Sequence, residues 1–225
     1  MLVVLEGLDG AGKSTQVSRL KEYLKTRCEK MEYIHFPRYD APVYGELISK
    51  FLRGDFGGND RVHPQLVALL FAEDRHGAAP QLKKALNDGA TVLLDRYVYS
   101  NIAYQCAKLS NPDEMEQLRE WILNTEFGEF DLPRPDLNIY LDVPIGFVEQ
   151  KLSSVRNGHD RDYLEGSKDI HESDLEFQKK VKSVYERQAS LDPKFIRIDC
   201  SDSEGRMLPP DEIAEKIRQT VDKAL

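Results

Sequence analysis

The feature that most constrains the fold is a glycine-rich stretch near the start of the chain. Residues 7–15 read G-L-D-G-A-G-K-S-T and contain the pattern G-x-x-x-x-G-K-[ST], which is typical of phosphate-binding loops. An apolar run (2–5) precedes the stretch and a helical pattern (16–25) follows it, so the motif joins a predicted strand to a predicted helix. The alternative is an ordinary Gly-rich turn, but the strand–loop–helix context favours a nucleotide-phosphate site.

Glycine lets the backbone of such a loop wrap a phosphate with its N–H groups pointing inward. Lys13 is expected to reach the outer phosphates, and Ser14 is expected to hold a magnesium ion. We predict that the whole loop binds the phosphates of ATP through Gly7, Leu8, Asp9, Gly10, Ala11, Gly12, Lys13, Ser14 and Thr15.

Length and composition place this loop in one acidic domain. The chain has 225 residues without an obvious linker or repeat, so we predict a single domain over residues 1–225. The formal net charge of −8 argues against nucleic-acid or membrane partners, because both need a basic face. Three widely spaced cysteines (Cys28, Cys106 and Cys200) indicate a reducing compartment, and Met1 next to a strand leaves no room for a signal peptide. We therefore expect a cytoplasmic protein.

Further apolar runs predict four more strands, at 32–36, 91–94, 137–143 and 195–199. Helical patterns lie between and after them, at 43–52, 64–77, 82–86, 100–107, 112–127, 144–152, 175–189 and 210–225. This alternation predicts an α/β fold with a five-stranded parallel sheet covered by helices on both faces.

Charged side chains follow two of these strands directly. Arg38 follows the second strand, and Asp95 and Arg96 follow the third. Ligands of open α/β sheets bind at this carboxyl edge. Asp95 is expected to be a magnesium-side carboxylate, although it could instead cap the next helix.

Phe71 and Arg75 are four residues apart on a predicted helix, so they share one face. A flat ring beside a planar donor fork suits a nucleobase, but a core phenylalanine and a carboxylate-paired arginine would give the same pattern. The same spacing relates two further pairs that can face one cleft: Ser100 with Tyr104, and Asn101 with Gln105.

The run 153–174 is dense in charge and reads as a solvated loop or as a lid that closes over the phosphate donor. Arg38, Arg75 and Arg96 supply the cations that a phosphate acceptor needs, whereas a hydroxyl acceptor usually needs a carboxylate base. The pattern favours a nucleoside monophosphate kinase. A deoxynucleoside (thymidine) kinase and a catalytically silent nucleotide-binding protein stay open as alternatives.

Five motifs in order make the chain resemble the thymidylate (dTMP) kinases over roughly residues 2–199. They are L-E-G-L-D-G-A-G-K-S-T, F-P-R-Y, L-F-A-E-D-R, D-R-Y followed by S-N-I-A-Y-Q, and L-P-R-P-D-L. The resemblance implies a P-loop nucleoside monophosphate kinase fold, transfer of phosphate from ATP to dTMP with Mg²⁺, a place in dTTP biosynthesis, and a homodimer.

The resemblance also implies roles for single residues. Phe71 would stack on thymine, while Arg75 and Asn101 would contact its edge. Tyr104 would crowd the sugar 2′ position and favour deoxyribose. The full substrate-binding set would be Asp9, Phe36, Arg38, Tyr39, Phe71, Arg75, Arg96, Ser100, Asn101, Tyr104 and Gln105, with Arg38, Tyr39 and Arg96 holding the acceptor phosphate.

One position departs from part of the family. Some members carry an arginine inside the phosphate loop, where this chain has Gly10-Ala11. In the bacterial-like subclass, lid arginines supply that charge, and Arg156 is preferred here over Arg161. The implied catalytic set is Lys13, Arg38, Arg96, Arg156 and Arg161, and the implied metal set is Ser14, Asp95, Asp9 and Glu172.

Overall fold

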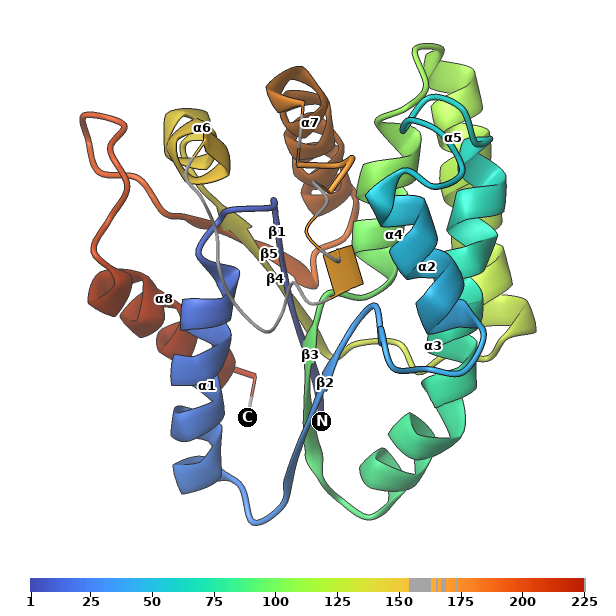
Figure 1. Ribbon diagram of the computed structural model, residues 1–225. Helices are drawn as coiled ribbons and strands as arrows, with labels where there is room; N and C mark the ends of the chain where they lie inside the picture. The colour runs from blue at the N-terminus through green and yellow to red at the C-terminus, as the bar shows by residue number, and fades with distance from the viewer. Residues whose placement is uncertain (154–162, 165, 167–168, 173, 225) are drawn as a thin grey trace.

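The computed structural model describes residues 1–153, 163–164, 166, 169–172 and 174–224. A five-stranded parallel sheet crosses its centre in the order β2-β3-β1-β4-β5 (Figure 1). The strands are β1 (Leu2–Gly7), β2 (Met31–His35), β3 (Thr91–Asp95), β4 (Leu137–Asp142) and β5 (Phe195–Asp199). The central strand β1 is buried along its whole length, as its apolar run requires.

The register of the sheet sets the carboxyl ends of three strands side by side. Leu5 pairs with Asp95 across β1 and β3, and His35 pairs with the same Asp95 from β2. The phosphate loop leaves β1 just beyond this point. The edge therefore brings Asp95 next to the loop, although the two are far apart in the sequence.

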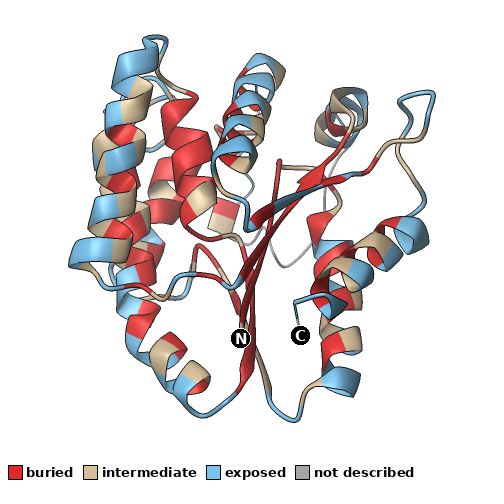
Figure 2. Ribbon diagram, turned by 180° about the vertical axis from the view of Figure 1, so that it is seen from behind, coloured by how far each residue is buried: buried red, intermediate tan, exposed pale blue. Residues whose placement is uncertain are grey.

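Helices cover both faces of the sheet (Figure 1). One face carries α1 (Lys13–Arg27) and α8 (Pro210–Asp222), and the other carries α3 (Pro64–Asn87), α4 (Val98–Cys106) and α7 (Leu175–Leu191). Around α3 and α4 pack α2 (Tyr44–Arg53), α5 (Pro112–Asn124) and the π-helical turn η1 (Thr125–Glu129), and α6 (Ile145–Ser153) follows β4. Burial is concentrated on the strands and on the helix faces turned toward them (Figure 2). The predicted α/β class with its parallel sheet is confirmed.

Helix α3 differs from the prediction of two separate helices at 64–77 and 82–86. It runs unbroken through Pro80. Proline removes one backbone hydrogen bond from a helix, but Ala78, Ala79 and Leu82 around it are buried in the core, and this packing sustains the helix. Among the described residues, no helix is both long and apolar enough to cross a membrane.

Candidate active site

The phosphate loop between β1 and α1 is built for an anion. Gly10 and Gly12 both have positive φ, at 76° and 75°, a conformation that favours glycine. The residue before α1 is Gly12, and no side chain caps the helix start. The first N–H groups of α1 are therefore open to a phosphate, as the sequence motif predicts.

Lys13 and Asp95 form an ion pair beside this loop. The Lys13 ammonium lies 2.8 Å from Asp95 Oδ1, and His35 Nδ1 lies 3.2 Å from Oδ2. Burial alone would raise the pKa of Asp95, but the charge of Lys13 and the hydrogen bond of His35 outweigh it and hold that pKa low. Asp95 is thus an ionised carboxylate at the loop and does not cap α4, whose N-cap residue is Tyr97.

The chemistry of the loop fits a magnesium ion. Among the described residues, no three His, Cys, Asp or Glu side chains gather into a metal cluster. Magnesium in kinases needs no such cluster, because one or two protein ligands are completed by phosphates and water. The exposed hydroxyl-bearing Ser14 and the buried Asp95 provide that small set. Asp9 already accepts hydrogen bonds on both carboxylate oxygens.

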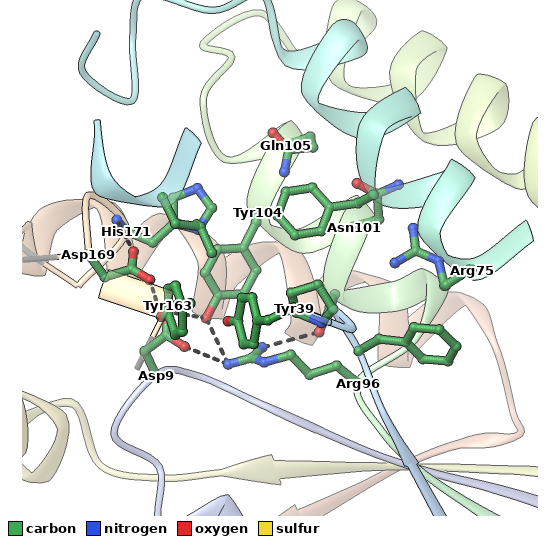
Figure 3. A pocket seen from close by; sticks show the side chains of 15 residues that line it. Asp9, Tyr39, Arg75, Arg96, Asn101, Tyr104, Gln105, Tyr163, Asp169 and His171 are labelled. Carbon is green, nitrogen blue, oxygen red and sulfur yellow. Dashed lines mark hydrogen bonds and ion pairs between the residues drawn. The ribbon is translucent and has the colours of Figure 1, made fainter. Parts of the chain in front are cut away.

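A pocket of about 540 Å³, part of it open to solvent, lies next to the loop (Figure 3). The lining residues are Asp9, Phe36, Pro37, Tyr39, Leu52, Phe71, Arg75, Arg96, Ser100, Asn101, Tyr104, Gln105, Tyr163, Asp169 and His171. All of the predicted substrate residues except Arg38 are in this set.

Arg96 lies at the end of the pocket that adjoins the loop. Its guanidinium donates to the Gly7 carbonyl at 2.9 Å and to Asp9 Oδ1 at 2.6 Å. Tyr104 Oη donates to Asp9 Oδ2 at 2.8 Å. Burial would raise the pKa of Asp9, but Arg96 and other neighbouring groups lower it. The carboxylate of Asp9 therefore holds Arg96 in place beside the loop.

Arg75 lies at the other end of the pocket, on α3. It donates two parallel hydrogen bonds to the fully buried Glu126 of η1, at 2.5 and 2.7 Å. Asn101 Nδ2 donates to the same carboxylate at 2.8 Å, while no described residue hydrogen-bonds the buried Asn101 Oδ1. Arg75 thus both pairs with a buried carboxylate and lines the pocket, so the two interpretations of its sequence pattern are compatible. One face of Arg75 is fixed by Glu126, and Asn101 keeps a free acceptor.

Arg38 binds Asp74 instead of lining the pocket. Its Nε and its backbone N–H both donate to the Asp74 carboxylate at 2.9 Å, and its Nη2 donates to the Asp74 carbonyl. The buried Asp74 lies on α3 beside Arg75. The arginine following β2 is therefore tied to the helix that carries Phe71 and Arg75.

Tyr163, Asp169 and His171 form the remaining wall (Figure 3). The Tyr163 ring stacks on Tyr39 with centroids 3.9 Å apart, and its hydroxyl donates to Asp169 at 2.8 Å. Burial and the nearby charge of Asp9 raise the pKa of Asp169 to about 7. Burial also lowers the pKa of His171 to about 3, so its imidazole is neutral. Arg156 and Arg161 lie outside the described residues.

Sequence reasoning missed the partners that hold the arginines. Asp74 and Glu126 were not singled out, and neither were His35 and Gln178, whose Nε2 donates to Asp9 at 3.2 Å. Asp74 lies in the titratable run 73–76 of a predicted helix, and nothing in that run indicated Arg38 as its partner. No signal near Arg75 in the sequence pointed to Glu126, because the two are brought together only by packing.

Comparisons with known proteins agree with this geometry. A family model described as thymidylate kinase matches residues 5–208. A thymidylate kinase of Mycobacterium tuberculosis is 32% identical over 190 residues, which cover 84% of this chain and 86% of that protein. A thymidylate kinase of Plasmodium falciparum is also 32% identical, over 88% of this chain and 81% of that protein. The solved structure of thymidylate kinase from Candida albicans superimposes with a TM-score of 0.70 at 28% identity, covering 99% of this chain and 91% of that one. The chain belongs to the thymidylate kinase family.

Proposed function

We propose that this thymidylate kinase, which transfers a phosphate from ATP to dTMP, uses the phosphate loop as its donor site and the adjoining pocket as its dTMP site. The observation that carries this division is the pocket itself. It has an arginine at the loop end, Arg96, and an aromatic ring beside an arginine at the far end, Phe71 with Arg75. A nucleoside monophosphate has the same two ends, an anion and a flat base.

In the donor site, the open N–H groups of the loop and α1 bind the ATP phosphates, and Lys13 neutralises charge on the transferring group. Lys13 leaves Asp95 for the phosphates when ATP binds. Ser14 and Asp95 would hold Mg²⁺, which supplies further charge neutralisation on the phosphates. Asp9 and Glu172 remain additional metal candidates from the family pattern.

In the acceptor site, Phe71 stacks on thymine, and Arg75 and Asn101 hydrogen-bond its edge. Arg96, with Arg38 and Tyr39, holds the acceptor phosphate. Arg38 must then exchange part of its contact with Asp74 for the phosphate. Tyr104 lines the pocket beside Asp9 and excludes a 2′-hydroxyl. A phosphate acceptor needs no general base, since its oxygens are already ionised near neutral pH.

The lid, the assembly and the location complete the proposal. Residues 153–174 form the lid, and Arg156 or Arg161 supplies the positive charge that the loop lacks at Gly10-Ala11. A homodimer rests on the family alone, and sedimentation at several concentrations tests it. A cytoplasmic location is supported by the free thiols of Cys28, Cys106 and Cys200.

A coupled assay across dTMP, dUMP, AMP, CMP, GMP and thymidine tests the function. We expect turnover of dTMP, little turnover of purine monophosphates, and none of thymidine. Turnover of thymidine without dTMP would replace the proposal with a nucleoside kinase. Binding of ATP without any turnover would indicate a silent nucleotide-binding protein.

A further inference from the structure

Glu6 is a fully buried carboxylate that the proposed site does not use. It is the next-to-last residue of β1, one position before the phosphate loop. Its Oε1 accepts the backbone N–H groups of Tyr97 and Ser100 at 2.9 and 3.1 Å. Both N–H groups lie at the start of α4, where the N-cap residue Tyr97 makes no side-chain hydrogen bond of its own. Glu6 therefore places a carboxylate of β1 at this helix N-terminus, a position that favours an anion.

The second oxygen of Glu6 accepts two hydroxyl groups. Ser100 Oγ lies 2.5 Å from Oε2, and Tyr185 Oη, from α7, lies 3.0 Å from it. Arg96 Nη1 in turn donates to Ser100 Oγ at 3.1 Å. An arginine has only donors, so Ser100 must accept from Arg96 and can give its single proton to Glu6. Ser100 Oγ also lies 2.8 Å from Tyr185 Oη, and either hydroxyl can donate, so the route from Arg96 through Ser100 reaches Glu6 directly or by way of Tyr185.

Arg96 needs such support because its backbone is strained. Its φ of 67° lies in the left-handed region, which a non-glycine residue keeps only when the surroundings hold it. Glu6 binds the residues on the C-terminal side of this turn, Tyr97 and Ser100, through their backbones. Burial raises the pKa of Glu6, while the Ser100 hydroxyl and the charge of Arg96 oppose that rise.

We infer that Glu6 is a positioning residue for dTMP binding, which orients the guanidinium of Arg96 through Ser100 and through the start of α4. The inference rests on the proposed role of Arg96 at the acceptor phosphate. It predicts that Glu6 affects dTMP far more than ATP, although Glu6 is directly attached to the ATP loop in sequence.

Glu6→Gln tests this with almost no change of shape. The amide nitrogen cannot face the two backbone N–H groups, so it must take the place of Oε2. In that position the amide nitrogen donates to Ser100 and Tyr185. The hydroxyl protons of Ser100 and Tyr185 and the guanidinium protons of Arg96 then outnumber the acceptors that remain. We expect the dissociation constant of dTMP, measured by calorimetry, to rise roughly tenfold, about 1.4 kcal/mol, while that of ATP changes less than twofold.

A double-mutant cycle separates positioning from general stability. Arg96→Lys alone should weaken dTMP binding, and adding Glu6→Gln to it should cost little more, since the positioned group is already gone. Full additivity of the two changes, or an equal loss of ATP and dTMP affinity, would make Glu6 a purely structural residue. If Arg96→Lys binds dTMP normally, the proposed role of Arg96 fails, which is a different result from failure of Glu6→Gln alone.

A pair of tyrosines provides a milder version of the test if Glu6→Gln does not fold. Tyr185 and Tyr140 are both fully buried and stack with centroids 4.8 Å apart, but only Tyr185 donates to Glu6. Tyr185→Phe should weaken dTMP binding, whereas the matched Tyr140→Phe should not. Equal dTMP affinities in the two variants, with Ser100→Ala also unchanged, would overturn the inference.

Discussion

The phosphate loop and the nucleotide pocket are adjacent but are built in different ways. The loop places its binding groups within one short stretch, residues 7–15, and most of them are backbone N–H groups. The pocket takes its lining from Asp9 of the loop, from the ends of β2 and β3, from α2, α3 and α4, and from Tyr163, Asp169 and His171. Its arginines are held by carboxylates, Asp9 for Arg96 and Glu126 for Arg75. Ligand binding and the stability of the fold are therefore more closely coupled in the pocket than in the loop.

The largest effect is expected where the pocket shares a buried ion pair with the core. Arg75→Ala should lower the free energy of unfolding by about 3–5 kcal/mol, because Glu126 is left buried and unpaired. Urea denaturation measures this change. The control is Arg218→Ala, which breaks an exposed pair with Glu215 and should cost at most about 1 kcal/mol. Equal losses in the two variants would refute the coupling of pocket and core.

A substitution in the phosphate loop should mainly affect the catalytic rate. Lys13→Ala should lower kcat roughly 10²–10³-fold, since the transferring phosphate loses a positioned charge. Steady-state kinetics measure it. Lys25→Ala, an exposed residue on the same helix α1, is the control and should leave kcat unchanged. Turnover of the Lys13 variant near that of the unmodified enzyme would remove this lysine from the mechanism.

A second lysine, Lys108, extends the comparison, because among the described residues its ammonium group has no hydrogen-bond partner. Lys108 Nζ is 4.7 Å above the Phe51 ring, and no described residue hydrogen-bonds it. Burial lowers its pKa from 10.5 to about 7. The folded state therefore binds this proton less tightly than the unfolded chain, and the protein loses stability as the pH falls from about 10.5 to about 7.

Lys108→Met removes the ammonium group, and with it this pH-dependent loss of stability, while the apolar part of the side chain is kept. The variant should be more stable near pH 7 by about 1–3 kcal/mol, with the difference shrinking toward pH 10. Urea denaturation across pH 7–10 measures it, and Lys84→Met, at an exposed lysine, is the control. A difference that does not vary with pH would show that Lys108 does not titrate in this range.

The smallest effect is expected from a single hydroxyl at the sugar position. Tyr104→Phe removes the hydrogen bond to Asp9 and should weaken dTMP binding by about 1 kcal/mol, since Arg96 still pairs with Asp9. Tyr99→Phe, on the same helix with its hydroxyl on Asp192, is the control. Tyr104→Ala should instead relax discrimination against the ribose form of the nucleotide, which competition between the two forms measures. An unchanged preference for deoxyribose would reject this role of Tyr104.

Patterns along the chain were enough to predict the parallel sheet and its edge. Apolar runs separated by helical patterns leave few ways to cover a sheet on both faces, and residues that follow strands must gather at one edge. Arg96 and Asp95 were placed at that edge for this reason. Helix α3 shows the limit of such reasoning, because Pro80 reads as a helix break until the burial of its neighbours is known.

The sequence by itself determined the phosphate loop, since its residues are consecutive and its glycines act through contiguous backbone. Only the tertiary structure decided how the arginines of the pocket are held. Glu126 meets Arg75, and Glu6 meets Ser100, across long separations in the chain. No local pattern encodes these contacts. They form because a buried charge must find a partner once the core has closed around it.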